Sequence, residues 1–322
     1  MTHTVAGFFS GTGGIELGLQ QAGFKIVYSN EFDKYAGETH VLNFGEEHFQ
    51  LEDINEVDFS TLPSPEMIVG GFPCQAFSIG GYRQGFNDAK GRGNLFFKIA
   101  EAVELHQPKV VLLENVKHLV THDKGNTFKV ILETLNELGY YTKWAVLNAK
   151  DYGNIPQGRE RVYIVSFKDE EAANRFTFPQ KTPLTVSVED LVDFESQVAD
   201  KYYYTAEKFP KMWDALSEGV TDQKVVYQWR RWYVRANKSG VCPTLVSSAG
   251  TGGHNVPIIL TKHGIRKLTP RECFNLMGYP VDFRIPEQSD SRLYKQSGNA
   301  VVVPVIRRIG EQIILATGSD FS

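Results

Sequence analysis

The chain has 322 residues, of which 42% are hydrophobic and 22% charged, and its formal net charge is −4. This ordinary globular composition excludes intrinsic disorder, collagen and coiled coils, no apolar run approaches the roughly 20 residues of a membrane helix, and Met1–Thr4 lacks the basic region of a secretory signal. Three cysteines cannot form a disulfide framework, and together with the composition this predicts a soluble, cytoplasmic protein. The length allows one large domain or two unequal ones.

The first half of the chain alternates short apolar runs with segments of helical periodicity. Such alternation predicts an α/β fold with a doubly wound, mostly parallel sheet of the Rossmann-like kind. The predicted strands are Val5–Phe9, Lys25–Ser29, Met67–Gly70, Val110–Leu113, Tyr141–Leu147 and Arg161–Phe167, and the predicted helices are Ile15–Gln21, Lys34–Phe44, Leu95–His106 after an Asn94 cap, and Thr127–Leu138.

The alternation stops near Pro179–Pro183, and the pattern up to about Pro286 is irregular and rich in turns. A second, smaller domain is therefore expected there. The last apolar segment, Val301–Leu315, is helical again after a Gly298–Asn299 turn and is expected to return to the first domain. The predicted boundaries are 1–180, 181–288 and 289–322.

Charge is segregated within this second region. Residues 186–222 carry nine acids and three lysines, whereas residues 223–271 carry nine bases and no acid, a charge of +9. Aromatic side chains alternate with these bases in Tyr227–Tyr233. Such a stretch indicates a binding surface for a polyanion such as nucleic acid, or else a solvated face beside an acidic neighbour.

A glycine loop, Gly11–Gly14, follows the first predicted strand and opens a helix, and Glu31 ends the next strand 20 residues after Gly11 (31 − 11). This spacing fits a carboxylate that binds ribose hydroxyls, although a glycine loop can also be only a tight turn. Glu16 stands where a dinucleotide fingerprint has its third glycine, and its charge would repel pyrophosphate. The loop therefore favours an adenosine cofactor without phosphate, and S-adenosylmethionine, with its positive sulfonium, is one.

Two nearby residues suit the same cofactor. Phe32 is placed to stack on adenine, and Asp53 to accept a hydrogen bond from the adenine amino group. Taken alone, an acid such as Asp53 ahead of Ile54 is more often an ordinary turn acid.

Polar residues also follow other strands, at the edge where loops line the active crevice of a parallel sheet. Cys74, in Gly71–Gln75, is a nucleophile if its pKa falls below about 8.5, and otherwise a small buried hydrophobe. The buried alternative is our prediction for Cys242 and Cys273. Glu114 closes an all-aliphatic strand and is suited to donate a proton to a ring nitrogen, or else to cap a helix or form a salt bridge.

Two arginines and a long loop complete this set. Alternation in an extended chain puts Arg159 and Arg161 on one side and Glu160 on the other, where two guanidiniums can bind a carbonyl oxygen, a carboxylate or a phosphate, or form a surface pair. Residues 76–93 contain five glycines and three bases, a composition typical of a lid or of a loop tip.

Together these residues resemble the cytosine-5 DNA methyltransferases of bacterial restriction–modification systems. The resemblance runs nearly end to end, with the motifs in family order, and is weakest over about 181–260, the variable target-recognition region of that family. Asn154 departs from the pattern as an extra residue. The matching motifs are Phe9–Gly14, Asn30–Glu31, Pro73–Gln75, Glu114–Val116, Gln157–Arg161, Arg266–Cys273 and Gly298–Val301.

The resemblance implies a S-adenosylmethionine-dependent methyltransferase fold and transfer of a methyl group to carbon 5 of a specific cytosine in duplex DNA. In that chemistry the Cys74 thiolate adds to carbon 6 of a flipped-out base, while Glu114 protonates or hydrogen-bonds ring nitrogen 3. Arg161 holds the base carbonyl and Arg159 supports the site. The resemblance also implies a monomer and a possible partner restriction endonuclease.

The expected site residues fall into two further groups. The cofactor residues are Phe9, Gly11, Thr12, Gly13, Gly14, Glu31, Phe32, Asp53, Ile54, Pro73, Asn299 and Ala300. The DNA-contacting residues are Gln75, Ser78, Arg83, Arg92, Arg230, Arg231, Arg235, Thr244 and Gly252.

Three other functions remain open at this point. A nicotinamide oxidoreductase is disfavoured by Glu16, an RNA cytosine-5 methyltransferase would use the same catalytic residues, and a catalytically dead DNA-binding module would be expected to lack some of them.

Overall fold

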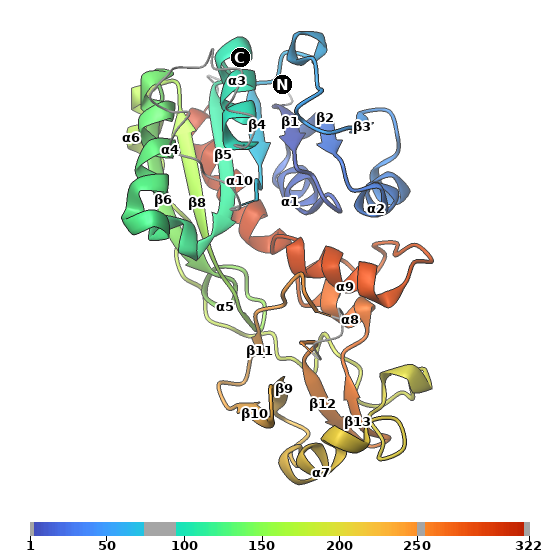
Figure 1. Cartoon of the computed structure of the whole chain (residues 1–322). Coiled ribbons are helices and arrows are strands. Elements are labelled where there is room, and N and C mark those ends of the chain that lie inside the picture. The colour runs from blue at the N-terminus through green and yellow to red at the C-terminus, as the bar shows by residue number, and fades with distance from the viewer. Residues whose placement is uncertain (1–2, 74–94, 250–254, 319–322) are drawn as a thin grey trace. The chain divides into compact units, whose positions relative to one another are not determined.

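The computed structural model describes residues 3–73, 95–249 and 255–318, and the chain forms two compact units (Figure 1). The first unit consists of Met1–Leu147, Glu160–Gln180 and Val305–Ser322. The second consists of Asn148–Arg159 and Lys181–Pro304. The predicted smaller domain, 181–288, therefore lies within the second unit, which also takes in residues 148–159 and 289–304.

The first unit is built on a seven-stranded sheet with the order β3-β2-β1-β4-β5-β8-β6. Neighbouring strands from β3 to β5 pair in parallel, and β8 runs antiparallel to β5. The α/β class and the mostly parallel sheet are confirmed. The strands are β1 (Thr4–Phe8), β2 (Lys25–Glu31), β3 (Phe49–Leu51), β4 (Met67–Gly70), β5 (Val110–Val116), β6 (Tyr141–Asn148) and β8 (Glu160–Phe167).

Helices cover both faces of this sheet. Phe8 and Ile68 share one apolar core with Phe96 of α3 and Ile131 of α4, all of them buried. On the other face α10 packs so closely on α1 that a Cβ at Gly310 would lie 2.9 Å from the Ala22 methyl. The helices are α1 (Gly14–Ala22), α2 (Lys34–Phe44), α3 (Leu95–His106), α4 (Asn126–Glu137), α6 (Glu170–Arg175) and α10 (Val303–Thr317, which begins in the second unit).

The second unit has more regular structure than its sequence predicts. Four strands form a sheet with the order β10-β9-β12-β13, and its apolar face packs on α7 around Leu216, Tyr227 and Ile258. These strands have only four or five residues each, too few to show a clear alternation. The elements are α5 (Ala149–Tyr152), β7 (Gln157–Gly158), α7 (Pro210–Gly219), β9 (Val226–Arg230), β10 (Tyr233–Asn237), β11 (Cys242–Pro243), β12 (Ile258–Thr261), β13 (Gly264–Lys267), α8 (Pro270–Asn275) and α9 (Asp290–Asn299).

The predicted Gly298–Asn299 turn is wrong, because both residues are helical and end α9. Glycine is needed at 298 for close packing, since a Cβ there would lie 2.3 Å from the Val246 carbonyl group. The three-residue strand β3 was not predicted. In the described ranges no helix combines the length and apolar character needed to cross a membrane.

Candidate active site

The glycine loop after β1 adopts a conformation that requires its glycines. Gly11 and Gly13 have positive φ angles of 54° and 83°, a region that side chains disfavour. Gly13 caps α1, and a Cβ on it would lie 2.2 Å from the Phe44 ring of α2. The backbone therefore bends sharply at the carboxyl end of β1. Within the loop, Thr12, Gly13 and Gly14 are buried.

Glu31, the predicted ribose-binding acid, organises this loop directly. Its Oε2 accepts a hydrogen bond from the Gly11 amide at 2.8 Å, and its Oε1 accepts from the Phe32 and Asp33 amides at 2.9 and 2.8 Å. Burial raises the pKa of Glu31, and these three amides partly lower it. Each carboxylate oxygen can accept more than one hydrogen bond, so the same group still suits ribose hydroxyls.

The two predicted adenine contacts differ in their surroundings. Phe32 is 68% exposed, so its ring is accessible for stacking. Asp53 is exposed too, and its Oδ1 accepts from the amide and side chain of Asn55 at 3.0 and 2.8 Å. The turn role that the sequence left open for Asp53 is therefore present. Ile54 is 3% exposed and belongs to the core.

Glu114, in β5, lies beside the turn that leads to Cys74. The Nε atom of Arg161 is 3.1 Å from Glu114 Oε1, and both side chains are largely buried. Asn115 donates from Nδ2 to the Phe72 carbonyl at 2.7 Å, and a Cβ on Gly71 would lie 3.4 Å from Glu114 Oε2. A carboxylate and a guanidinium are thus fixed next to the Gly71–Pro73 segment.

The two motif arginines bind different partners within the described residues. Arg159, 2% exposed and outside any strand, donates to three backbone carbonyls of the second unit at 2.6 to 3.0 Å. Arg161 pairs with Glu114, whereas Glu160 pairs with Lys117 at 3.0 Å. Arg159 is therefore a structural cross-link, and its acceptors are the carbonyls of Leu245, Gly298 and Ala300.

Several predicted residues lie outside the described residues. They are Cys74, Gln75, Ser78, Arg83, Arg92 and Gly252. Pro73 is the last described residue before the first of these gaps. The prediction for the other two cysteines is confirmed, because Cys242 and Cys273 are 0% and 1% exposed and burial raises the pKa of both thiols.

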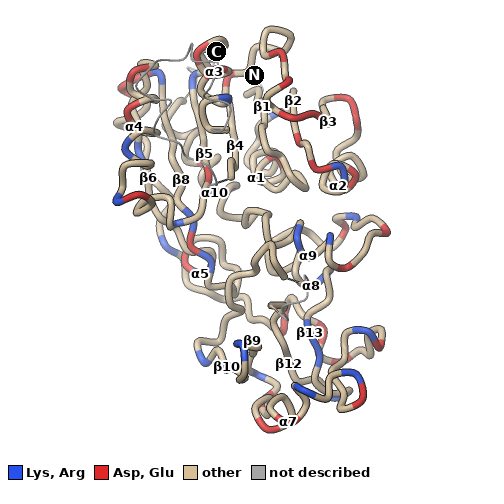
Figure 2. Tube along the Cα trace, in the orientation of Figure 1, with Lys and Arg blue, Asp and Glu red and all other residues tan. Residues whose placement is uncertain are grey.

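Three of the predicted DNA-contacting arginines, Arg230, Arg231 and Arg235, lie on one hairpin of the second unit. Strands β9 and β10 pair antiparallel with Arg230 opposite Tyr233, so Arg231 and Trp232 form the turn. Arg231 has a positive φ of 54°, and Trp232 is 87% exposed. Arg235 lies on the exposed side of β10, while Val234 and Ala236 pack on the core. The hairpin is a candidate nucleic-acid interface, and Figure 2 shows basic residues along it.

The charge of +9 counted for 223–271 overstates this interface. Arg266 is fully buried and makes a two-pronged ion pair with Glu272 at 2.6 and 2.8 Å. Lys262 pairs with Glu195 at 2.8 Å, and Arg271 donates to the Phe283 carbonyl. Acids outside the segment thus neutralise part of its charge, which the linear count could not reveal.

Two more of the predicted residues, Thr244 and Asn299, lie in the second unit. The Thr244 hydroxyl donates to the Gly158 carbonyl, and Asn299 ends α9. The extra residue Asn154 has a positive φ of 51°, and its Oδ1 accepts from the Thr185 amide at 2.7 Å. The departure from the family pattern is thus absorbed by a local turn.

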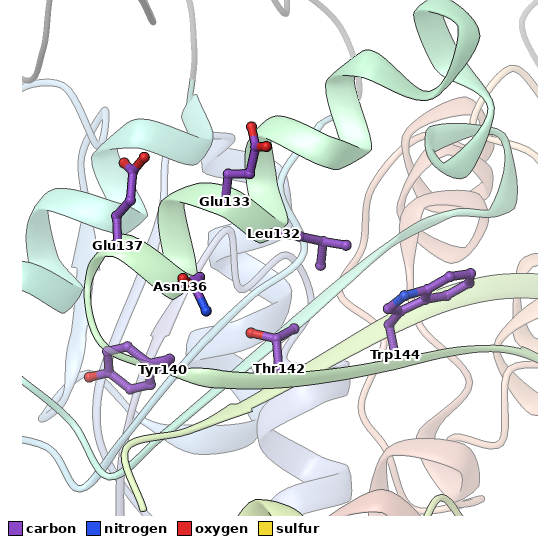
Figure 3. A pocket seen from close by; sticks show the side chains of 7 residues that line it. All are labelled: Leu132, Glu133, Asn136, Glu137, Tyr140, Thr142 and Trp144. Atoms are coloured by element: carbon purple, nitrogen blue, oxygen red, sulfur yellow. The ribbon is translucent and has the colours of Figure 1, made fainter. Parts of the chain in front are cut away.

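Sequence reasoning gave no role to Asn115 or Trp232, and it did not foresee how deeply Glu16 is buried. Asn115 stands inside a quoted motif and Trp232 among the alternating aromatics, so both had a sequence signal, whereas the burial of Glu16 had none. A surface hollow of about 510 Å³ lies between α4 and β6 (Figure 3). None of the predicted site residues lines it; its lining is Leu132, Glu133, Asn136, Glu137, Tyr140, Thr142 and Trp144.

Known proteins resemble this chain over nearly its whole length. The family model for C-5 cytosine-specific DNA methylase matches residues 3–315. The type II methyltransferase M.Bsp6I of Bacillus sp. (strain RFL6) is 52% identical over 96% of this chain and 98% of its own. M.HhaI of Haemophilus parahaemolyticus is 41% identical over 95% of this chain and 92% of its own.

Solved structures share the fold. A DNMT2 variant of Spodoptera frugiperda matches with a TM-score of 0.73 at 19% identity, covering 97% of this chain and 100% of that one. Dnmt2 of S. pombe matches with a TM-score of 0.72 at 17% identity, covering 98% and 99%. From the family model and the sequence relatives, the chain belongs to the C-5 cytosine-specific DNA methylases and is a DNA (cytosine-5-)-methyltransferase.

Proposed function

We propose that this enzyme methylates one cytosine within a short target site in duplex DNA, with Cys74 as nucleophile and S-adenosylmethionine as methyl donor, as the modification arm of a bacterial restriction–modification system. The observation that carries this proposal is the Glu114–Arg161 pair, 3.1 Å apart, beside the segment that leads to Cys74. An acid and a guanidinium at that place match the polar groups of cytosine, which are a ring nitrogen, an amine and a carbonyl.

Each residue has a defined part in the proposed reaction. Addition of the Cys74 thiolate to carbon 6 makes carbon 5 a nucleophile, and loss of the carbon-5 proton later expels the thiolate. Glu114 hydrogen-bonds the exocyclic amine and delivers a proton to ring nitrogen 3. Arg161 donates to the base carbonyl while it holds Glu114. A base stacked in a duplex cannot meet these groups, so the target must be flipped out, at a cost of a few kcal/mol.

The first unit also offers a fitting place for the cofactor. The loop has no lysine for phosphate, its backbone bends at Gly11 and Gly13, and Glu31 fixes it. In this proposal Glu31 binds the ribose, and Phe32 and Asp53 bind the adenine. The bound cofactor supplies an electrophilic methyl group. Asn299 and Ala300 remain proposed cofactor residues on the basis of their motif.

The β9–β10 hairpin is the proposed reader of DNA. Arg230, Arg231 and Arg235 carry charge for phosphates or guanine edges, and exposed Trp232 at the turn offers a flat apolar surface to bases or sugars. Packing of the opposite side of the hairpin on α7 supports this assignment, because it leaves the charged side in solvent.

Bisulfite sequencing of DNA from cells expressing the enzyme tests this proposal. We expect complete methylation of one cytosine in a short repeated motif, and no methylation in cells expressing Cys74→Ser. Transfer RNA from the same cells tests the less supported RNA alternative and should stay unmodified. Unmethylated DNA in cells that contain the folded wild-type protein would contradict the proposal.

The proposal extends to the cellular setting. We propose a monomer, acting in the bacterial cytoplasm, that protects its target site from a cognate restriction endonuclease. Sedimentation of the free enzyme tests the first point, and resistance of the methylated DNA to endonucleases that cut the motif tests the last.

A further inference from the structure

Glu16 is a buried carboxyl group for which the reaction described above has no use. It lies in the first turn of α1, directly after the glycine loop, and is 2% exposed. No hydrogen bond of normal geometry reaches either of its oxygens from the part of the chain that the structure describes. The carboxyl group lies against β1, since a Cβ on Gly7 would be 2.4 Å from Glu16 Oε1. Glycine at position 7 is what leaves room for it.

Two buried hydroxyls lie around the same glycine. The Ser10 hydroxyl would be 3.3 Å from a Cβ on Gly7, and Ser29 pairs with Gly7 in parallel register, so it projects to the same face of the sheet. Both hydroxyls are buried and, like Glu16, make no hydrogen bond of normal geometry in the described ranges, although the Ser10 hydroxyl lies near enough to Glu16 to lower its pKa in part. Buried polar atoms are normally satisfied. Unpaired polar groups clustered beside the glycine loop therefore indicate that a bound ligand supplies their missing charged or polar partner.

Within the described ranges, the charged group that acts on Glu16 is another acid, Glu31, and no cation compensates it. Burial raises the pKa of Glu16 to about 7, the Ser10 hydroxyl and the Glu16 amide lower it in part, and the charge of Glu31 on β2 raises it further. Asp33, which caps α2, is acidic. His40 of α2 is buried, and burial lowers its pKa to about 4, so it is neutral. On α10, Arg307 lies half-exposed and pairs with Glu311.

A cationic ligand would change this balance. S-adenosylmethionine carries one more positive charge than S-adenosylhomocysteine, the product left after methyl transfer. The amino end of α1 disfavours a cation, because the helix dipole is positive there. A carboxylate buried under the loop offsets that repulsion and attracts the sulfonium, and this attraction is stronger in a buried site than in water.

We propose that Glu16 is the counter-charge of the methyl-donor site, ionising when the cationic donor occupies the glycine loop and thereby favouring the donor over its neutral thioether product. This inference rests on the proposed use of S-adenosylmethionine. It assigns Glu16 as a specificity-determining residue that acts on charge, whereas the backbone of the loop and Glu31 recognise the adenosine part common to both molecules.

Binding of the cationic donor is linked to ionisation of Glu16, so its affinity depends on pH. A bound cation lowers the pKa of Glu16, so binding of S-adenosylmethionine releases a proton below about pH 7 and grows tighter as pH rises through 7. A shift of one pKa unit would release roughly half a proton at pH 6.5 and tighten binding about tenfold between pH 5.5 and 8. Binding of S-adenosylhomocysteine should show neither effect.

Isothermal titration calorimetry of both ligands, in buffers of different ionisation enthalpy between pH 5.5 and 8, tests the proposal. The proteins are the full-length wild type, Glu16→Gln and the control Glu47→Gln, whose side chain is 87% exposed in the same unit. At pH 8 Glu16→Gln should lose roughly tenfold in its preference for S-adenosylmethionine over the product, and at pH 5.5 it should match the wild type. The control should match the wild type throughout.

A wrong cofactor assignment and a wrong counter-charge role give different results. If the wild type binds no S-adenosylmethionine at any pH, the cofactor assignment fails. If it binds but releases the same number of protons as Glu16→Gln, or if the preference is unchanged in Glu16→Gln, the counter-charge role is refuted and the cofactor stands. Should Glu16→Gln not fold, Gly7→Ala displaces the carboxyl group instead, and the same loss of preference is expected.

Discussion

The buried carboxyl of Glu16 makes the stability of the ligand-free enzyme depend on pH in an unusual direction. Its pKa is about 7 in the folded chain against an ordinary value of 4.5. A raised pKa in the folded state means that folding favours the neutral acid, so stability is full below pH 4.5 and is lost as pH rises toward 7. Between pH 5 and 8 this loss amounts to roughly 2–3 kcal/mol.

Replacing Glu16 by glutamine should remove this dependence. The amide buried in Glu16→Gln adds a constant cost at every pH, which cancels when the same variant is compared at two pH values. Relative to the wild type, Glu16→Gln should therefore gain about 2–3 kcal/mol in unfolding free energy on going from pH 5 to pH 8.

Urea unfolding at pH 5 and pH 8, without ligand, measures this gain. Glu47→Gln is again the control, because the Glu47 side chain is 87% exposed. If the unfolding free energies of the wild type and Glu16→Gln changed in parallel with pH, the reasoning would be refuted, because the Glu16 carboxyl would then titrate as it does in water.

Three further predictions concern the site and its support. Glu114→Gln should lower kcat by about 10²–10⁴, the usual contribution of a general acid, in an assay of methyl transfer to the target duplex, and an unchanged kcat would exclude that role. Iodoacetamide should leave Cys242 and Cys273 of the native protein unlabelled, because both are buried; rapid labelling of either, located by peptide mass spectrometry, would contradict the packing. Gly298→Ala would place a methyl group 2.3 Å from the Val246 backbone and should cost about 1–3 kcal/mol in urea unfolding, whereas wild-type stability would show that this close approach is absent.

Local patterns predicted the framework of the first unit because its elements are long or strongly apolar. The helix Lys34–Phe44 and the strand Met67–Gly70 have the bounds that the sequence predicted. Strand β3 was missed because three residues show no period. In the second unit, short strands with mixed exposure obscured the alternation in the same way.

Local sequence patterns could not predict contacts between residues that are far apart along the chain. The carbonyls that bind Arg159 lie 86, 139 and 141 residues away along the chain. Alternation along the strand could suggest an anion site or a surface pair for Arg159, but it could not reveal these backbone acceptors. Glu16 shows the same limit, because a helix periodicity does not reveal that the carboxyl group folds over a glycine in β1.

Trapping with 5-fluorocytosine tests the central claim, nucleophilic attack by Cys74, most directly. The fluorinated base is placed at the target cytosine that bisulfite sequencing identifies and is incubated with enzyme and S-adenosylmethionine. Fluorine replaces the proton that must leave carbon 5, so the account predicts a DNA–protein adduct that survives denaturation and maps to Cys74 in the digested protein. No adduct with the active enzyme, or an equal yield with Cys74→Ser, would contradict it.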